Sequence, residues 1–187
     1  MKRTHASCDS EDFGNITISL ELPCSVTKLP EINRVVLECV KADTLTEIPQ
    51  IDKNIAWKVK EIVIRNQPKL SNISTNDFIR YYNLEKLTVA NSGLESLEID
   101  CFRCLHRLRS LSLVKNQFKH MKWNNFITVS EEFQELDISE NPLECSCELM
   151  WISEWLKIAE PQCVILGAAD CEFPVSVREL FNLPYRI

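Results

Sequence analysis

The segment LEKLTVANSGL, residues 84–94, combines a strand-like alternation of residue types with a polar ending. Leu87 and Val89 are apolar and Thr88 between them is polar, so in an extended chain the two apolar side chains point to one face. The segment therefore predicts a short β-strand with one buried face. After such a strand the chain must turn within a packed interior, and here the turn contains the small polar Ser92.

The same pattern recurs in three other segments, VKEIVIRNQPKL (59–70), LRSLSLVKNQF (108–118) and FQELDISENPL (133–143). Equivalent strand positions are separated by 25, 24 and 25 residues, and phenylalanines recur every 24 residues between the segments. Because several columns keep register over four units, we interpret the pattern as an internal repeat. The apolar columns are Val59, Leu84, Leu108 and Phe133; Ile62, Leu87, Leu111 and Leu136; Ile64, Val89, Leu113 and Ile138; Leu70, Leu94, Phe118 and Leu143; and Phe78, Phe102 and Phe126.

A polar residue follows each strand, at Gln67, Ser92, Asn116 and Asn141. Backbone N–H and C=O groups in a buried turn need hydrogen-bond partners, and side chains of this kind can supply them. The phenylalanine column is expected to fill the opposite side of each unit. Since no single unit can bury its own apolar face, successive units are expected to stack.

The repeat resembles the leucine-rich repeat, L-x-x-L-x-L-x-x-N-x-L. The resemblance implies an α/β leucine-rich repeat solenoid with a short parallel sheet on its concave face, an irregular convex side and disulfide-capped ends. We expect an N-terminal segment and cysteine cap over 1–55 and the repeats over 56–140. A cysteine-rich C-terminal cap is expected over 141–174, followed by a tail or linker over 175–187.

The overall composition argues against several classes of protein. The 21 Lys+Arg and 27 Asp+Glu residues give a net charge of −6, so nucleic acid is not an expected partner. No stretch approaches the roughly 20 apolar residues that a membrane span requires. Residues 1–15 carry positive charge but no apolar segment, so we expect no secretory signal peptide there. Nine cysteines nevertheless favour an oxidising compartment, and together these observations favour a fragment of a longer protein.

Four cysteines, Cys145, Cys147, Cys163 and Cys171, follow the last repeat and flank the apolar segment ELMWISEWLKI. Zinc is disfavoured because the first pair is spaced C-x-C and no histidine follows His120. A catalytic thiol is disfavoured because no histidine base with an orienting group is suggested. The favoured interpretation is a cross-linked cap, whose helix lies across the open end of the stack. This end resembles the cysteine-rich C-terminal flank of extracellular leucine-rich repeat proteins, which implies the pairs Cys145–Cys163 and Cys147–Cys171.

The segment RVVLECVKADTLTEIP resembles the last strand of an N-terminal cysteine cap, and the pair Cys24–Cys39 is favoured there. Cys8 is left unassigned. Cys101 precedes a column phenylalanine and is most simply a small buried side chain, rather than half of a redox pair with Cys104. Because nine is an odd number, at least one thiol is free or pairs with another chain.

Four stretches carry a closer resemblance: VKEIVIRNQPKL, LEKLTVANSGLESLEIDCF, LRSLSLVKNQFKHMKW, and NPLECSCELMWISEW followed by DCEFP. Over about residues 55–174 they resemble the extracellular leucine-rich region of Trk-type neurotrophin receptor kinases. The resemblance implies a non-catalytic extracellular module for ligand recognition, receptor spacing or adhesion. Its partner would be a protein, such as a basic neurotrophin-like growth factor or another receptor. The alternative is a self-standing secreted leucine-rich repeat protein of adhesion or immune recognition.

The outward strand positions of the predicted sheet supply a candidate protein-binding face. Its first two units are basic and its last is acidic, which gives a graded field along a face of small side chains. The face lacks aromatic residues, which usually anchor protein interfaces. The candidate residues are Arg65, Lys86, Thr88, Ser110, Ser112, Glu135 and Asp137.

Two N-glycosylation sequons occur, NIT at Asn15 and NIS at Asn72, and we expect Asn72 in a turn away from the concave sheet. No enzyme, metal or cofactor is predicted. The three histidines, His5, His106 and His120, lie in the N-terminal segment and on separate repeats, so they do not form a nucleophile, base and orienting group with other residues.

Overall fold

The fold is described from a computed structural model of the chain. The residues that it describes are 24–29, 34–40, 43–126, 128–130, 132–144, 149, 151 and 164–166.

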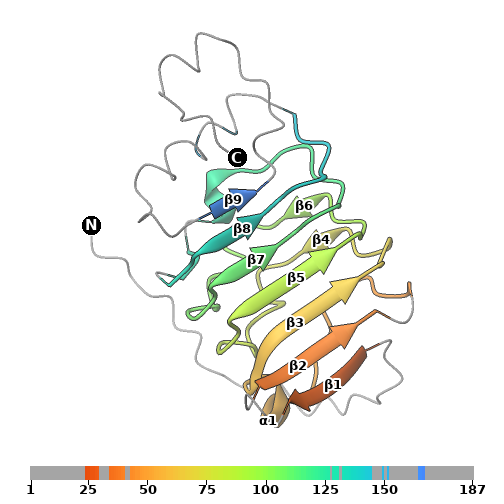
Figure 1. The fold of residues 1–187 in the computed structure, drawn as a ribbon, viewed down its shortest axis with the longest axis vertical. Helices are drawn as coiled ribbons and strands as arrows, with labels where there is room; N and C mark the ends of the chain where they lie inside the picture. The colour runs from red at the N-terminus through yellow and green to blue at the C-terminus, as the bar shows by residue number, and fades with distance from the viewer. Residues whose placement is uncertain are drawn as a thin grey trace.

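One seven-stranded sheet runs the length of the molecule, in the order β1-β2-β3-β5-β7-β8-β9 (Figure 1). Strand β1 is antiparallel to β2, and every other neighbouring pair is parallel. The strands are β1 (Cys24–Leu29), β2 (Arg34–Cys39), β3 (Val59–Arg65), β5 (Lys86–Ala90), β7 (Ser110–Ser112), β8 (Glu135–Asp137) and β9 (Val164–Leu166).

The four repeats predicted from the sequence are strands β3, β5, β7 and β8 with the loops that follow them. Their register aligns Ile62 with Leu87, Leu87 with Leu111, and Leu111 with Leu136. All four of these side chains are fully buried, so the apolar column of the sequence is a continuous row in the core. The predicted leucine-rich repeat solenoid with a parallel sheet is therefore confirmed.

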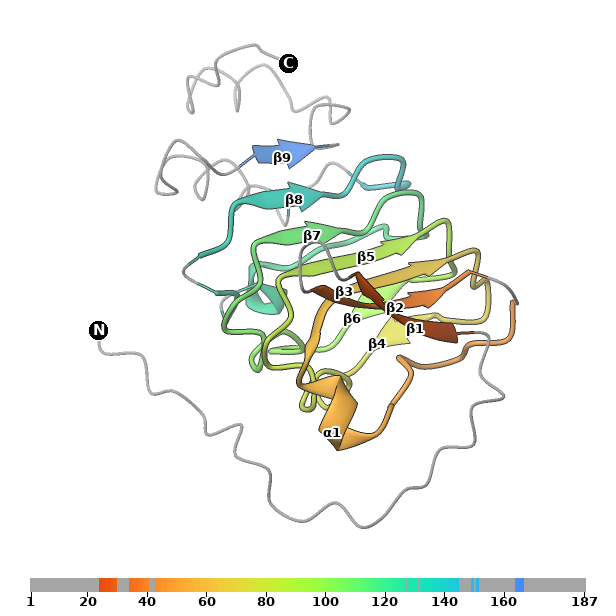
Figure 2. The ribbon, with the colours of Figure 1, turned by 60° about the horizontal axis from the view of Figure 1, so that its bottom comes forward.

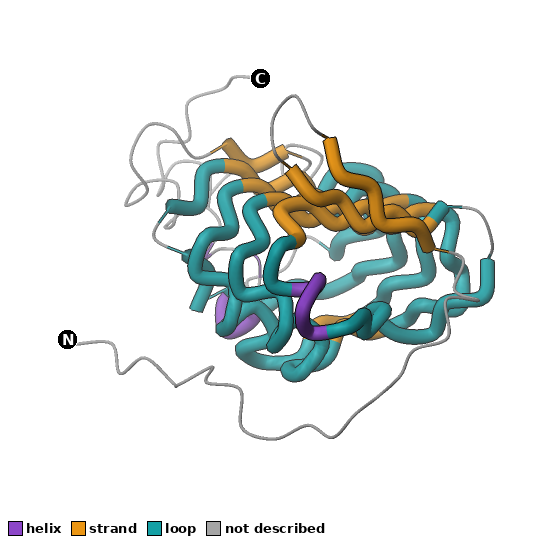
Figure 3. The backbone as a smooth tube through the Cα atoms, turned by 90° about the horizontal axis from the view of Figure 1, so that it is seen from below, coloured by secondary structure: helices purple, strands orange, loops and turns teal. Residues whose placement is uncertain are grey.

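Loops make up most of the molecule on the side away from the sheet, as Figure 3 shows. Two short strands, β4 (Asn72–Ile73) and β6 (Ser96–Leu97), pair there as a separate parallel sheet (Figure 2). Helix in the described residues is limited to α1 (Lys53–Ala56), the 3₁₀ turn η2 (Trp123–Asn125) and single positions near the C-terminal cap. The convex side is thus irregular, as predicted.

The phenylalanine column forms a ladder of rings inside the loop side, with one stacked and one tilted contact. Ring centroids are 6.1 Å apart between Phe78 and Phe102 and again between Phe102 and Phe126. Trp151 continues the ladder at 5.1 Å from Phe126 and donates its indole N–H to the Met121 carbonyl at 3.0 Å. A residue of the predicted cap therefore closes this column of the repeat core.

The polar column satisfies the backbone of the turns, as predicted. Asn116 is 2% exposed, and its Nδ2 donates to the carbonyls of Val89 at 2.7 Å and Leu113 at 2.8 Å. Its Oδ1 accepts from the N–H of Ser92 at 3.1 Å, in the preceding repeat. Asn141 repeats the arrangement one turn later, where its Oδ1 accepts from the N–H of Asn116 at 3.2 Å. Each side chain therefore joins its own turn to the one before it.

The residue before each polar column position has left-handed backbone. These residues are Asn66, Asn91, Lys115 and Glu140, with φ of 59°, 48°, 58° and 54°. The sharp turn after each strand requires this conformation, which asparagine tolerates better than most residues. Successive turns also approach closely: a Cβ on Gly93 would lie 2.2 Å from the Pro68 carbonyl oxygen, so only glycine fits there.

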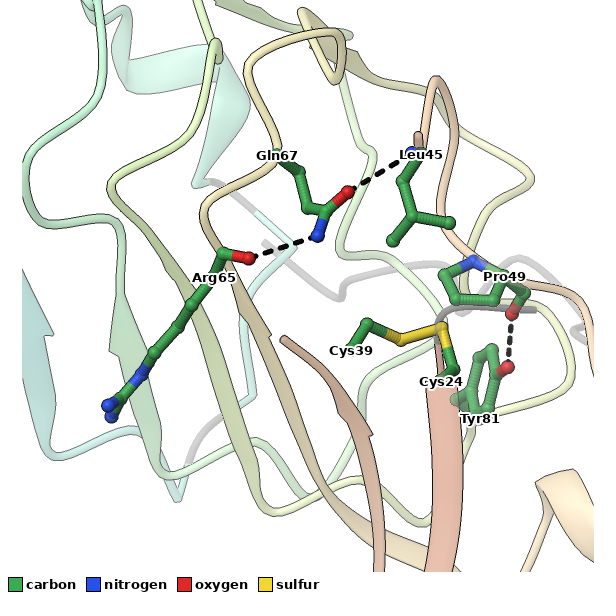
Figure 4. Close-up of a disulfide and its surroundings, with 7 residues drawn as sticks. All are labelled: Cys24, Cys39, Leu45, Pro49, Arg65, Gln67 and Tyr81. Atoms are coloured by element: carbon green, nitrogen blue, oxygen red, sulfur yellow. Dashed lines mark hydrogen bonds between the residues drawn. A yellow bond between two sulfur atoms is a disulfide. The ribbon is translucent and has the colours of Figure 1, made fainter. Parts of the chain in front are cut away.

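The N-terminal unit, which comprises β1, β2 and the loop after them, is cross-linked within itself by a disulfide and is joined to the repeats by polar contacts (Figure 4). Cys24 and Cys39 form a disulfide between β1 and β2. Gln67 Oε1 accepts from the Leu45 N–H at 3.1 Å, and the buried Tyr81 hydroxyl donates to the Pro49 carbonyl. Of the predicted cap helix, Leu149 and Trp151 are described and both are buried.

Candidate protein-binding surface

The outer side of the seven-stranded sheet, which we call the sheet face, carries the candidate residues in two rows. Parallel pairing places Lys86 beside Ser110 and Ser110 beside Glu135. The second row is Thr88, Ser112 and Asp137, again one residue from each strand. Arg65, at the end of β3, lies beside Ala90 of β5. The structure therefore brings all seven predicted residues onto one face.

Charge changes along the sheet face from one strand to the next. Arg65, Lys86 and Glu135 are exposed, and Asp137 is half-buried. Glu135 accepts a hydrogen bond from the Ser110 hydroxyl at 2.8 Å. Adjacent strands are about 4.8 Å apart, so Lys86 and Glu135 lie about 10 Å from each other, two strands apart. The face thus presents Arg65 and Lys86 at β3 and β5, where Glu61 of β3 is paired with Arg34, and it presents acidic groups at β8.

Ser139 fixes the orientation of the acidic Asp137 through its backbone N–H and its hydroxyl. Its Oδ1 accepts from the N–H of Ser139 at 3.0 Å and from the Ser139 hydroxyl at 2.6 Å. The carboxylate therefore occupies a defined position on β8 before any partner binds, which lowers the entropic cost of binding.

Thr88 differs from the expectation, because it is only 7% exposed. It lies in the middle of its row, between Val63 of β3 and Ser112 of β7. Thr88 lies on the sheet face, but the flanking side chains leave it little surface for a partner. Residues next to the strand in space, rather than in sequence, produce this burial.

An ion-pair group at the start of the strands joins the N-terminal unit to two repeats. Arg34 on β2 contacts Glu61 of β3 and Glu85 just before β5, each at 3.3 Å. Lys60 contacts the other oxygen of Glu85 at 2.9 Å. Burial of Glu85 opposes ionisation, but the bonded Lys60 ammonium and the nearby Arg34 hold the pKa of its carboxyl below the ordinary value. The group therefore stabilises the stacking of successive strands.

The described cysteines are either disulfide-bonded or, in the case of Cys101, a buried free thiol. Cys101 is a free thiol, 1% exposed, and burial raises its pKa well above the ordinary value, so it is not a nucleophile at neutral pH. Cys104 is disulfide-bonded, which the sequence left open. The predicted pairs Cys145–Cys163 and Cys147–Cys171 lie outside the described residues.

Two exposed aromatic residues were not included in the candidate site derived from the sequence. Trp57 and Tyr82 are 43% and 41% exposed, and both lie just before a strand, beside the sheet face. Their 25-residue separation equals the repeat spacing, and this spacing was the sequence signal that could have identified them as a pair. The columns next to them contain buried aromatic and aliphatic residues, so sequence alone does not distinguish an exposed column from a core column.

Outside the sheet face, the described residues also include short helices and a polar hollow. No group of three or more His, Cys, Asp or Glu side chains among them is placed to hold a metal ion. The helices in the described ranges are all too short to span a bilayer. An open polar hollow of about 550 Å³ lies beside the turns of Asn66 and Asn91, whose amides hydrogen-bond each other at 2.6 Å.

The sequon residue Asn72 lies in β4, on the separate two-stranded sheet, rather than in the turn predicted from the sequence. Its Oδ1 accepts from the Ser96 hydroxyl at 2.9 Å, and its side chain is half-buried. Asn72 is therefore away from the sheet face, as expected. The other sequon residue, Asn15, lies outside the described residues.

Parallel strands in stacked turns, a polar column in each turn and a phenylalanine ladder behind the sheet define the class of protein, a leucine-rich repeat solenoid. No protein-family model matches the chain. The "High affinity nerve growth factor receptor" of Mus musculus is 31% identical over 148 residues, covering 76% of this chain and 18% of the receptor. The "NT-3 growth factor receptor" of Gallus gallus is 28% identical over 158 residues, covering 84% of this chain and 17% of that receptor. The "NT-3 growth factor receptor" of Homo sapiens is 32% identical over 107 residues, covering 57% of this chain and 12% of the receptor.

The chain is thus a distant homologue of Trk-type neurotrophin receptors over most of its length, and the resemblance predicted from the sequence is confirmed. It spans less than a fifth of the length of these relatives.

Proposed function

We propose that the chain is a non-catalytic, extracellular protein-binding module of a Trk-like receptor, acting in ligand recognition, receptor spacing or adhesion. Homology to the two growth factor receptors is the observation that carries the proposal. The Cys24–Cys39 disulfide supports an oxidising compartment. The partner is a protein, either a basic neurotrophin-like growth factor or another receptor.

The sheet face is the proposed binding surface for this partner. Glu135 and Asp137 supply negative charge that suits a basic ligand, while Arg65 and Lys86 at the other end favour one orientation of that ligand over its reverse. The serines between them leave room for a partner's larger side chains. Thr88 is omitted from the proposed contact set because of its burial.

A charge-reversal pair tests the proposed surface. Nerve growth factor and NT-3 would each be passed over the immobilised whole chain in a surface plasmon resonance experiment. We expect the Glu135→Lys, Asp137→Lys variant to bind the recognised ligand at least about tenfold more weakly, because like charges would then face each other. The matched control is Glu140→Lys with Glu144→Lys, which makes the same charge change at exposed sites off the strands. Lys115 already occupies the turn position equivalent to Glu140, so the control should fold.

Equal loss of binding in both variants would show that net charge, and not the sheet face, determines recognition. Failure of the wild-type chain to bind either growth factor would exclude these ligands and leave a receptor as the proposed partner. A pull-down with the extracellular region of a Trk-type receptor would then test that alternative.

The proposed extracellular module also has a proposed set of disulfides. We retain the pairs Cys145–Cys163 and Cys147–Cys171 for the C-terminal cap. With Cys101 free and Cys24 paired to Cys39, Cys8 is then the cysteine left within the chain for Cys104. Non-reducing peptide mapping by mass spectrometry tests these pairs, and a peptide joining Cys104 to a cap cysteine would contradict them.

Glycosylation at Asn15 and Asn72 would accompany secretion of the module. A glycan on Asn72 would leave the sheet face open, because β4 belongs to the other sheet. We expect Asn72→Gln to remove one glycan from chain secreted by animal cells, detected as a mass difference that disappears after enzymatic deglycosylation. Identical masses of the two secreted chains before deglycosylation would contradict the assignment.

A further inference from the structure

A second surface lies at the start of the strands, beside the sheet face. Its centre is three exposed side chains, Ile55, Trp57 and Tyr82, which we call the edge patch. They are 43%, 43% and 41% exposed. Single exposed apolar side chains are common on protein surfaces. A contiguous group of large ones is unusual and marks an interaction site. The described positions of the sheet face itself contain no aromatic residue.

The register of the repeats brings the edge patch together. Trp57 and Tyr82 each lie four residues before Glu61 and Lys86, which are partners in the parallel pair β3 and β5. The Asn83 side-chain amide donates to the Trp57 carbonyl at 3.0 Å, so the two turns touch at this point. Ile55 is on α1, which leads into β3, and its carbonyl accepts from the Lys58 N–H at 2.9 Å. The three side chains therefore come from one short helix and two adjacent turns.

The backbone that carries the edge patch is held in place from behind. Three residues close in sequence to the exposed ones are fully buried, namely Ala56, Tyr81 and Leu84. The Asp52 side chain caps α1 by accepting from the Asn54 N–H at 2.7 Å. The backbone under the patch is therefore held in place before a partner arrives, which lowers the entropic cost of binding to it.

Cations outnumber carboxylates around the edge patch, where Asp52 is exposed at the start of α1, although the net charge of the chain is −6. Lys53, Lys58 and Arg107 are exposed, and none of the ion pairs formed among the described residues uses them. Lys58 Nζ lies 5.4 Å from the centroid of the Trp57 ring. Arg107 occupies the position equivalent to Asn83 on the following turn. These cations are therefore available to a partner.

Two further cations of the same edge are neutralised by the chain itself. Lys60 bonds Glu85 at 2.9 Å, and Arg109 bonds Glu132 at 2.6 Å. The remaining positive charge is therefore concentrated around the aromatic residues rather than spread along the whole edge.

We infer that the edge patch is a second binding site, for an acidic protein segment that carries apolar side chains. Trp and Tyr are the residues that most often anchor protein interfaces, and basic residues at the rim select acidic partners. A sulfated polysaccharide would use the cations but would leave the exposed Ile55 without an apolar partner. This site is separate from the sheet face and opposite to it in charge preference, so it does not depend on the function proposed above.

Fluorescence anisotropy of a short fluorescein-labelled peptide, with leucines set among glutamates, tests the inference with the whole chain. We expect saturable binding that weakens about tenfold or more in the Trp57→Ala, Tyr82→Ala variant. Lys58→Glu should also weaken it, and so should replacing the leucines of the peptide by serines. The matched controls are Ile99→Ala, which removes a 62% exposed apolar residue elsewhere, and Lys115→Glu, which reverses an exposed cation on the opposite edge.

The sheet-face variant Glu135→Lys, Asp137→Lys should retain peptide binding, which separates this inference from the proposed function. No binding of the peptide at about 1 mM would overturn the inference. A second result would also overturn it. In that result the Trp57→Ala, Tyr82→Ala variant binds the peptide as tightly as wild-type chain does, and it binds a heparin oligosaccharide with unchanged affinity as well. Urea denaturation of each variant shows that the fold is retained.

Discussion

Asn116 shows how a single polar residue holds the turns of this solenoid together. It hydrogen-bonds carbonyls of its own turn and of the previous one, as well as the Ser92 N–H, while being 2% exposed. In a buried turn these backbone groups have no access to water, so removing the amide leaves them unsatisfied. The turn also has a local backbone requirement, since the residue before each polar position has positive φ.

We expect Asn116→Ala to lower the free energy of unfolding by about 3 kcal/mol, because several buried backbone groups lose their partner. Urea denaturation followed by circular dichroism measures the change. Asn124→Ala is the matched control, because Asn124 is exposed and should change stability by less than about 0.5 kcal/mol. Equal stability of the Asn116 and Asn124 variants would contradict the role assigned to the polar column.

At the scale of elements, the stacked strands and the phenylalanine ladder couple one repeat to the next. Phe102 contacts Phe78 on one side and Phe126 on the other, with centroids 6.1 Å away in both cases. The sequence predicted the column from its 24-residue spacing, because a constant spacing places equivalent residues above each other in every stacked unit.

Phe102→Ala should cost about 3–5 kcal/mol of stability, because it removes a large buried ring and leaves a cavity between two others. The exposed Tyr82→Ala removes an aromatic ring of similar size from the surface and should cost far less. Thermal or urea unfolding of both variants provides the comparison. A Phe102 variant no less stable than the Tyr82 variant would show that the ladder does not form.

The ion-pair group around Glu85 predicts a dependence of stability on pH. Its pKa is lowered relative to the ordinary value of 4.5, so its contribution is present above about pH 4.5 and is lost as the pH falls through the folded-state pKa. We expect Glu85→Gln to be less stable than wild type by about 0.5–1 kcal/mol at pH 7 and equally stable at strongly acidic pH. Urea midpoints across this pH range measure the difference, with the exposed Glu95→Gln as control. A constant difference at every pH would exclude an electrostatic origin.

At the scale of the whole molecule, each repeat contacts its neighbours in a linear stack, so stability at the ends differs from stability in the middle. Strands β1 and β2 form the N-terminal end of the described sheet, and the Cys24–Cys39 disulfide joins them across a separation of 15 residues. Leu149 and Trp151 cover the repeat core at the other end.

Replacing both Cys24 and Cys39 by serine should lower the free energy of unfolding by about 3 kcal/mol, because the unfolded chain regains the entropy of a closed loop. Hydrogen exchange followed by mass spectrometry should show faster exchange first in β1 and β2, with β7 and β8 affected least. Uniform acceleration along the chain would mean that the molecule unfolds as one unit rather than from its end.

The sequence by itself determined the repeat, the strands at its centre, the polar turns and the row of phenylalanines. These follow from local alternation and constant spacing, which act in the same way on every unit of a stack. It also placed the seven candidate residues on one face, because side-chain direction along a strand alternates regularly.

Only the tertiary structure decided which outward residues are accessible. Thr88 is buried by side chains of the flanking strands, whereas Trp57 and Tyr82 are exposed at the start of the strands. The contacts of Arg34 with Glu61 and Glu85, and the pairing of β4 with β6, likewise join residues from different turns. Exposure and charge pairing depend on neighbours that the stack brings together, so they are properties of the folded solenoid and not of any one repeat.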